Sequence, residues 1–237
     1  MEKKYELTES KIYCGITLYR IKALRDLWNV KAGDLGGWVE SELNLSHEGN
    51  CWIYNDAIVC NNAMVCKYAI VCNNAIVADN AIISDNAQIG DNALILDNAK
   101  ISGTAVIWGS PKVVGNAKVF GNATVSAYAM ICEGAQVFGR AFVEGESFIG
   151  GSAKIYDNAI VGENARVFDN AKICDNACVF GNAQVYDNAV VDGDAQVYGN
   201  AGIFNSVRVS GNAKVSGYAK VFGNLVIDGD THISRTN

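Results

Sequence analysis

Proline and histidine are scarce in this chain, and long apolar runs are missing. The 237 residues include one Pro and two His. The eight Cys form no Cys-x-x-Cys pair, so we expect no zinc or other metal site. No apolar run has the length of a membrane span, and the first residues lack the apolar core of a signal peptide. We therefore expect no membrane contact and a cytoplasmic location.

The charge balance also excludes some partners. Lys and Arg number 19 against 25 Asp and Glu, which gives a net charge of −6. An acidic chain is not drawn to phosphate backbones at long range, so broad nucleic-acid binding is not expected. No glycine-rich phosphate loop lies between a strand and a helix, so no cofactor is expected either.

The dominant feature is a period of six residues. Ile or Val occupies every sixth position from 53 to 233, which makes 31 positions without an insertion. The residue two before it is nearly always Ala, preceded by Asn and then by Gly or Asp. The exceptions at the Ala slot from residue 57 onward are Pro111, Ser147, Val207, Leu225 and Thr231. The repeating unit is therefore [Gly/Asp]-Asn-Ala-x-[Ile/Val]-x.

Each slot in this unit has a structural reason. Ala and Ile/Val are two residues apart, so both can point inward from an extended segment. Gly and Asn tolerate left-handed backbone and suit a tight corner, where stacked Asn amides can also pair. Three short strands and three corners close a coil of 18 residues, and coils stack about 4.8 Å apart. The sequence thus predicts an all-β, single-stranded parallel β-helix of about ten coils over residues 49–237, after a leader at residues 1–48.

The repeat resembles that of the hexapeptide-repeat proteins, [Ile/Leu/Val]-[Gly/Ala/Glu/Asp]-x-x-[Ser/Thr/Ala/Val]-x, as in Ile89-Gly-Asp-Asn-Ala-Leu94. This resemblance covers residues 49 to about 235 and implies a left-handed helix. The leader contains Leu18–Leu24, Val30–Glu40 and Asn44–Trp52. Joined to Asn-Ala rungs, it resembles the YdcK-like group of these proteins. Some members of that group are described as acyltransferases by analogy of fold.

The leader is expected to form small β strands that cap the first coil, since a bare solenoid end exposes unpaired backbone groups. The outward positions of the first coils are apolar and need a cover, either the leader or a partner subunit. These positions are Trp52, Ile58, Met64, Ile70, Ile76 and Ile82.

Catalysis finds little support. The resemblance implies that an acyltransferase of this type would use an acyl-coenzyme A thioester and a catalytic His near an extruded loop. This repeat has no such loop, and the two His are His47, before the first rung, and His232, in the last. We expect no catalytic residue, with His47 the candidate only if the chain is an acyltransferase. Corner carboxylates such as Asp157 and Asp175 stack 18 residues apart; a bound calcium ion is conceivable, but solvated corners are the favoured interpretation.

Two outward faces carry candidate binding residues when the chain is aligned at a spacing of 18. One face has a basic column beside aromatic residues, which could hold a small anionic or nucleotide-like ligand. Its candidate residues are Lys118, Phe138, Lys154, Tyr156 and Lys172, flanked by Lys100, Phe120 and Arg208. The alternative is a solvated face whose aromatic rings shelter the lysine stems.

The second face is apolar and is the candidate interface of a homo-oligomer, either a dimer or a trimer. Its candidate residues are Leu94, Leu96, Val114, Met130, Cys132 and Phe148. The leading interpretation is a non-catalytic β-solenoid that serves as a binding or structural scaffold and self-associates through this face. The alternatives are a hexapeptide-type acyltransferase and a sponge that sequesters a small anionic or nucleotide-like ligand.

Overall fold

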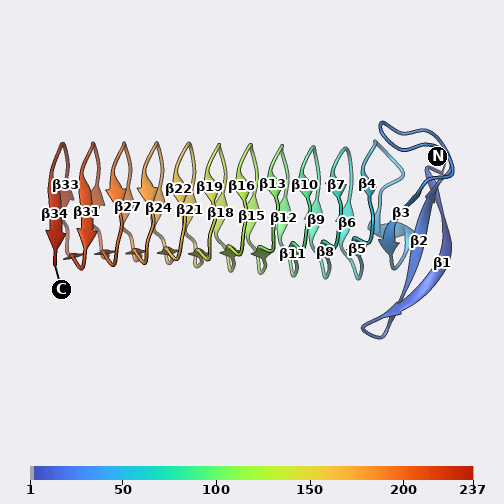
Figure 1. Cartoon of the computed structure of the whole chain (residues 1–237), viewed down its shortest axis with the longest axis horizontal. Helices are drawn as coiled ribbons and strands as arrows, with labels where there is room; N and C mark the ends of the chain where they lie inside the picture. Colours follow the sequence, from blue (N-terminus) through green and yellow to red (C-terminus); the bar gives the residue numbers. More distant parts are fainter. Residues whose placement is uncertain (1–2, 237) are drawn as a thin grey trace.

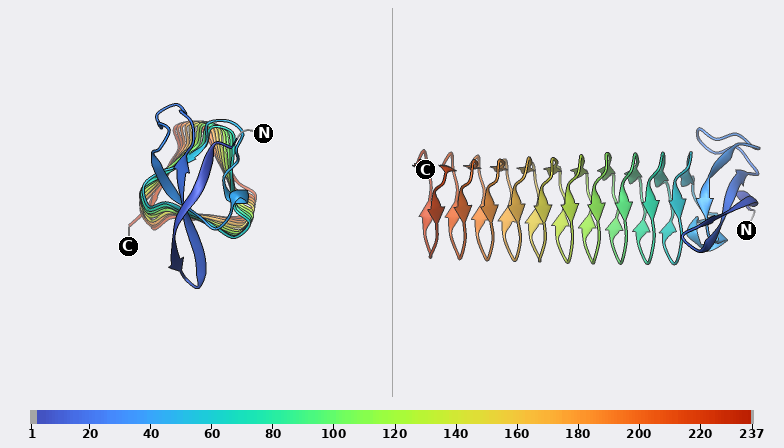
Figure 2. Two further views of the ribbon diagram at one scale, coloured as in Figure 1. Left: turned by 90° about the vertical axis from the view of Figure 1, so that its right-hand side faces the viewer. Right: turned by 60° about the horizontal axis from the view of Figure 1, so that its bottom comes forward.

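The structure is a computed structural model that describes residues 3–236, and these residues form a long rod of stacked coils (Figure 1). Seen along its axis the rod has a three-sided outline, with the leader lying across one end (Figure 2). Each side is one β-sheet, and within the solenoid each strand pairs in parallel with the strand 18 residues further along the chain, as Leu94 does with Lys112. The expected all-β solenoid with an N-terminal β capping segment is confirmed.

The strands of the solenoid are short, and their order in each sheet follows the coils. The 13-stranded sheet contains β1 (Tyr5–Tyr13), β2 (Ile16–Ala23), β3 (Leu35–Val39), β5 (Ile58–Val59), β8 (Ile76–Val77), β11 (Leu94–Ile95), β14 (Lys112–Val113), β17 (Met130–Ile131), β20 (Phe148–Ile149), β23 (Arg166–Val167), β26 (Gln184–Val185), β29 (Gly202–Ile203) and β32 (Lys220–Val221).

The other two sheets belong entirely to the solenoid. The 11-stranded sheet contains β4 (Trp52–Ile53), β7 (Ile70–Val71), β10 (Gln88–Ile89), β13 (Val106–Ile107), β16 (Thr124–Val125), β19 (Phe142–Val143), β22 (Ile160–Val161), β25 (Cys178–Val179), β28 (Gln196–Val197), β31 (Lys214–Gly217) and β34 (His232–Arg235). The 10-stranded sheet contains β6 (Met64–Val65), β9 (Ile82–Ile83), β12 (Lys100–Ile101), β15 (Lys118–Val119), β18 (Gln136–Val137), β21 (Lys154–Ile155), β24 (Lys172–Ile173), β27 (Val190–Val191), β30 (Arg208–Val209) and β33 (Val226–Ile227).

The core has the composition that the repeat predicts. The Ile or Val of each rung is fully buried from Ile53 to Val215, and the Ala slot beside it is buried almost as completely. Small and β-branched side chains fill the narrow interior, because three sheets leave little space between them. In residues 3–236 the helical structure is a single 3-10 turn, η1 (Glu42–Asn44), and no helix has the length and apolar character that crossing a membrane requires.

The corners are built by the first residue of each unit. Every sixth residue from Gly49 to Gly229 has a positive φ. Gly, Asn or Asp occupies most of these positions, since they adopt left-handed backbone most easily. The next residue, usually Asn, forms the ladder that the sequence predicts. For example, the Asn62 amide donates to Asn80 Oδ1 at 3.1 Å, and the Asn80 amide donates to Asn98 Oδ1 at 3.2 Å.

The leader caps the N-terminal end of the rod. Strand β1 pairs antiparallel with β2, β2 pairs antiparallel with β3, and β3 joins the solenoid in parallel with β5. This arrangement buries Trp52 and Ile58, as expected, whereas Met64 remains 40% exposed. The expectation that the outward apolar residues of the first coils are all covered is therefore right for two of them and wrong for Met64.

The opposite end of the described chain has no such cover (Figure 1). Leu225 occupies an inward Ala slot, yet it is 52% exposed, and Val226 is 70% exposed. Strands β32, β33 and β34 each lie at the end of their sheet, so one backbone edge of each strand faces solvent.

Candidate binding surfaces

The basic column lies on the outer face of the 10-stranded sheet and consists of Lys100, Lys118, Lys154 and Lys172. The sheet register pairs Lys100 with Lys118 and Lys154 with Lys172, with Gln136 between the two pairs. No residue of the described chain forms an ion pair with these four lysines. Arg208, further along the same column, differs because it binds Asp192 at 2.8 Å. Four unpaired ammonium groups thus follow one line along the rod.

The aromatic ladder runs beside this column and consists of Phe120, Phe138 and Tyr156. Its rings stack with centroids 4.9 and 5.0 Å apart and planes within 3° of parallel. Both faces of Phe138 are therefore covered by its neighbours, and only ring edges point outward. A ring edge carries the positive end of the aromatic quadrupole. The ladder consequently has no free Phe138 face for a nucleotide base, whereas its edges favour a negative ligand.

Beyond the ladder, the residue with metal-ligand chemistry nearest Tyr156 is Cys174. Asp157, Cys174 and Asp175 place one ligand atom each within 4.8 Å of one another. Burial raises the pKa of the Cys174 thiol, and a hydrogen bond with that thiol raises the pKa of Tyr156 above its usual range. Asp157 accepts the backbone N–H of Asp175 at 3.5 Å. These groups therefore have partners within the corner, which gives the stacked carboxylates a structural use.

The apolar strip, Leu94, Leu96, Val114, Met130, Cys132 and Phe148, lies on the outer face of the 13-stranded sheet. Cys132 is buried and the other five are partly exposed. The register places exposed Lys112 between Leu94 and Met130, so the strip is not continuous. The spacing of 18 already reveals Lys112 in the sequence. The Arg166 guanidinium, one coil beyond Phe148, lies 5.7 Å from its ring centre.

The leader covers one end of this strip. Leu18 and Trp38 pack with Ile58, Cys60 and Ala78, and Leu96 lies against the same cluster. Val114, Met130 and Phe148 lie on later coils, outside this cluster. The part of the strip available to another molecule is therefore shorter than the sequence suggests.

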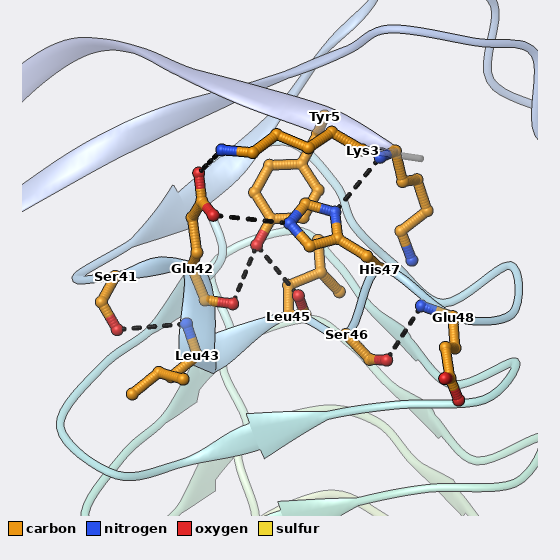
Figure 3. Close-up of polar contacts among 10 residues, drawn as sticks. Lys3, Tyr5, Ser41, Glu42, Leu43, Leu45, Ser46, His47 and Glu48 are labelled. Atoms are coloured by element: carbon orange, nitrogen blue, oxygen red, sulfur yellow. Dashed lines mark hydrogen bonds and ion pairs between the residues drawn. The ribbon is translucent and has the colours of Figure 1, made fainter. Parts of the chain in front are cut away.

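His47 packs at the capped end of the rod, away from both columns (Figure 3). Its ring stacks on Tyr5 with centroids 4.4 Å apart, and its Nδ1 accepts the backbone N–H of Lys4 at 3.2 Å. Its Nε2 faces Glu42 Oε2 at 3.7 Å, and Glu42 also binds Lys3 at 2.6 Å. Because Nδ1 accepts a hydrogen bond, the neutral ring carries its proton on Nε2.

This geometry restricts the chemistry that His47 can perform. A general base needs a free lone pair directed at its substrate. The Nδ1 lone pair of His47 is occupied by a backbone N–H, and its Nε2 faces a carboxylate. Tyr5 completes the cluster by donating from its hydroxyl to the carbonyl of Leu45 at 2.9 Å. The cluster joins β1 to the segment that precedes the first coil.

The cysteines have the character of buried apolar residues. All eight are free thiols. Burial raises the pKa of Cys60 to about 11 and also raises the pKa values of Cys66, Cys72 and Cys132. A nucleophilic cysteine needs a lowered pKa, and none of these four has one.

Comparison with known proteins agrees with the repeat. A family model described as the YdcK β-solenoid repeat matches residues 195–211. A segment of 54 residues, 23% of this chain, is 37% identical to a protein of Escherichia coli (strain K12) named "Uncharacterized acetyltransferase YdcK". The match spans 17% of the length of that relative.

Proposed function

Since the chain is a β-solenoid that carries the YdcK-type repeat, we propose that it serves as a non-catalytic binding scaffold whose basic column holds an anionic ligand. The observation that carries this proposal is the line of four lysines without an ion pair, on a chain whose net charge is −6. Two ammonium groups about 5 Å apart repel each other by roughly 0.8 kcal/mol in water-like surroundings. A bound anion relieves this repulsion.

The aromatic ladder supports an anion rather than a nucleotide base. Positive ring edges lie beside the lysines, and the faces that a base would need are stacked on each other. Inorganic pyrophosphate and polyphosphate are suitable probes, because they carry negative charge without a base.

The test is calorimetric titration of the full chain with polyphosphate at 20 and 300 mM salt. A double variant, Lys118→Gln with Lys154→Gln, removes charges from the column. The matched control, Lys112→Gln with Lys214→Gln, removes two exposed lysines from the other two sheets. We expect binding that weakens with salt, is lost in the column variant and persists in the control. Equal losses in both double variants, or no binding at 20 mM salt, would refute the proposal.

We also propose that the chain self-associates through the apolar strip. Val114, Met130 and Phe148 are partly exposed and lie outside the cluster formed with the leader. Light scattering on the wild type and on a Met130→Glu, Phe148→Glu double variant tests this. We expect a wild-type dimer or trimer that the two charges dissociate. A wild-type monomer at micromolar concentration would contradict the proposal.

An acetyltransferase activity, as in the name of the Escherichia coli relative, is the alternative function. The occupied Nδ1 of His47 argues against it. We expect no acetyl transfer from acetyl-coenzyme A to sugars or amines. Turnover that disappears in a His47→Ala variant would establish the alternative instead.

A further inference from the structure

An exposed tryptophan lies on the loop between β2 and β3, at the N-terminal end of the rod (Figure 1). Trp28 is 78% exposed, whereas its near neighbours Leu27 and Val30 are 7% and 3% exposed. The two buried residues anchor the loop on the solenoid core. The large ring between them therefore points outward from a fixed base.

Hydrogen bonds hold this loop in one shape. Asp26 accepts the backbone N–H of Ala32 at 3.0 Å and pairs with the Lys31 ammonium at 2.9 Å. Asp34 accepts the backbone N–H of Lys31 at 2.7 Å. A loop ordered in advance loses little conformational entropy when a ligand binds to it.

The indole forms one wall of a cleft with the first coils. Trp28, Asn50, Tyr68 and Asn86 line a volume of ≈ 260 Å³. Tyr68 is 52% exposed, so two aromatic side chains meet solvent here. Tyr68 also borders a second hollow of ≈ 430 Å³, which includes Ser46 and Met64 in its lining.

Tyr68 also interrupts the corner ladder. It occupies a slot that usually holds Asn, 18 residues from both Asn50 and Asn86. Elsewhere the slot forms amide ladders, such as the bond from Asn74 to Asn92 at 3.3 Å. In the described chain the amides of Asn50 and Asn86 form no bond of this kind, since the residue between them has no amide.

We infer that this cleft, defined by Trp28, Asn50, Tyr68 and Asn86, is a binding site for a neutral carbohydrate. Sugar rings present C–H groups on their faces, which suit aromatic side chains, and hydroxyls at their rims. A primary amide both donates and accepts hydrogen bonds, so it can bind a hydroxyl in either sense. A cleft that combines apolar walls with a few polar groups is typical of small-molecule sites.

The lining distinguishes this site from the basic column. None of the four lining residues is charged, so the cleft offers no partner to an anion. The two sites are also on different parts of the rod, since the cleft lies at the first coils and the column begins at Lys100. This inference therefore goes beyond the proposed anion binding and does not depend on it.

The experiment titrates the full chain with three hexasaccharides and follows tryptophan fluorescence and heat. Two are neutral, the N-acetylglucosamine and the α-1,4-glucose hexamers, and one is anionic, the galacturonate hexamer. Trp28 is exposed while Trp38 and Trp52 are buried, so binding should shift the emission of Trp28 to shorter wavelength. We expect at least one neutral hexamer to bind, and to bind more tightly than the anionic one.

Two variants make the test specific. Trp28→Ala removes one wall, and Tyr68→Asn removes the other while it restores an Asn ladder, so the fold should persist. We expect either change to weaken binding by about tenfold or more. Tyr128→Asn is the matched control, because it makes the same exchange in the same slot on a distant coil, and it should leave affinity unchanged. The column variant Lys118→Gln with Lys154→Gln should also bind normally.

Three results would overturn the inference. The first is that neither neutral hexamer binds at millimolar concentration. The second is that affinity in both cleft variants remains within twofold of the wild type. The third is tighter binding of the galacturonate hexamer.

Discussion

Two alanines that lie two residues apart should respond oppositely to the same substitution. Ala127 occupies a corner with a φ of 57°, whereas Ala129 occupies an inward slot and is fully buried. The left-handed conformation costs a residue with a Cβ roughly 1–2 kcal/mol. Glycine avoids this cost but loses about 0.5–1 kcal/mol through its freer unfolded chain. Ala127→Gly should therefore stabilise the rod by about 0.5–1 kcal/mol.

Ala129→Gly should destabilise it. The change removes a buried methyl group, worth about 0.8 kcal/mol, and adds the same glycine entropy. The expected loss is about 1.5 kcal/mol, because no left-handed strain is released at this position. The two variants thus differ by about 2 kcal/mol, although their composition is identical.

Urea denaturation followed by circular dichroism measures both free energies, and calorimetry provides the midpoints. For a chain of this size 1 kcal/mol corresponds to about 2–4 °C. A lower midpoint for Ala127→Gly than for the wild type would refute the corner argument. Equal shifts for the two variants would refute the assignment of the slots.

Three further predictions concern the core, the leader and the thiols. Val161→Asp should cost several kcal/mol in urea denaturation, since it buries an unpaired carboxylate in the core, and an unchanged midpoint would contradict the register. Hydrogen bonds from Trp38 and Arg20 lower the pKa of Asp56. The contribution of Asp56 is thus present above its unfolded pKa of about 3.9 and is lost as pH falls through the folded value. Hydrogen exchange of β2 and β3 should accelerate in acid, and Asp56→Asn should remove that dependence. One thiol should react rapidly with an aromatic disulfide reagent at neutral pH, and Cys14→Ser should abolish that phase, because Cys14 is exposed.

The six-residue period was sufficient to predict the core and the columns. A β-branched residue at every sixth position can point inward only in a coil with three corners, so Val125, Val161 and Val179 were assigned to one face correctly. The same periodicity aligned Lys118 with Lys154 and Phe120 with Phe138. Periodicity places a side chain on a face, but it does not set ring orientation. The stacking of Phe138 on its neighbours follows from rotamers that the spacing leaves open.

Sequence reasoning was weaker for the leader, because its structure depends on contacts distant in the chain. The docking of Leu18 and Trp38 on Ile58, and the exposure of Trp28, follow from packing that no period encodes. One signal for the cleft was nevertheless present in the sequence. Tyr68 replaces Asn in the corner slot, as do Tyr128 and Tyr218, but only the spatial position of the leader distinguishes Tyr68 from the other two.

The unequal ends of the rod give its unfolding a direction. Each coil touches only its neighbours, so loss of a terminal coil exposes the next one and the solenoid can unravel stepwise. The leader secures the first coils through β3 and β5, whereas the coil that carries Leu225 and Val226 has neighbours on one side alone. We expect heat or pulling force to peel the rod from residue 236 backward, with the cleft at Trp28 among the last features to dissolve. The distance from the bare end thus acts as a clock that sets the order in which the binding surfaces disappear.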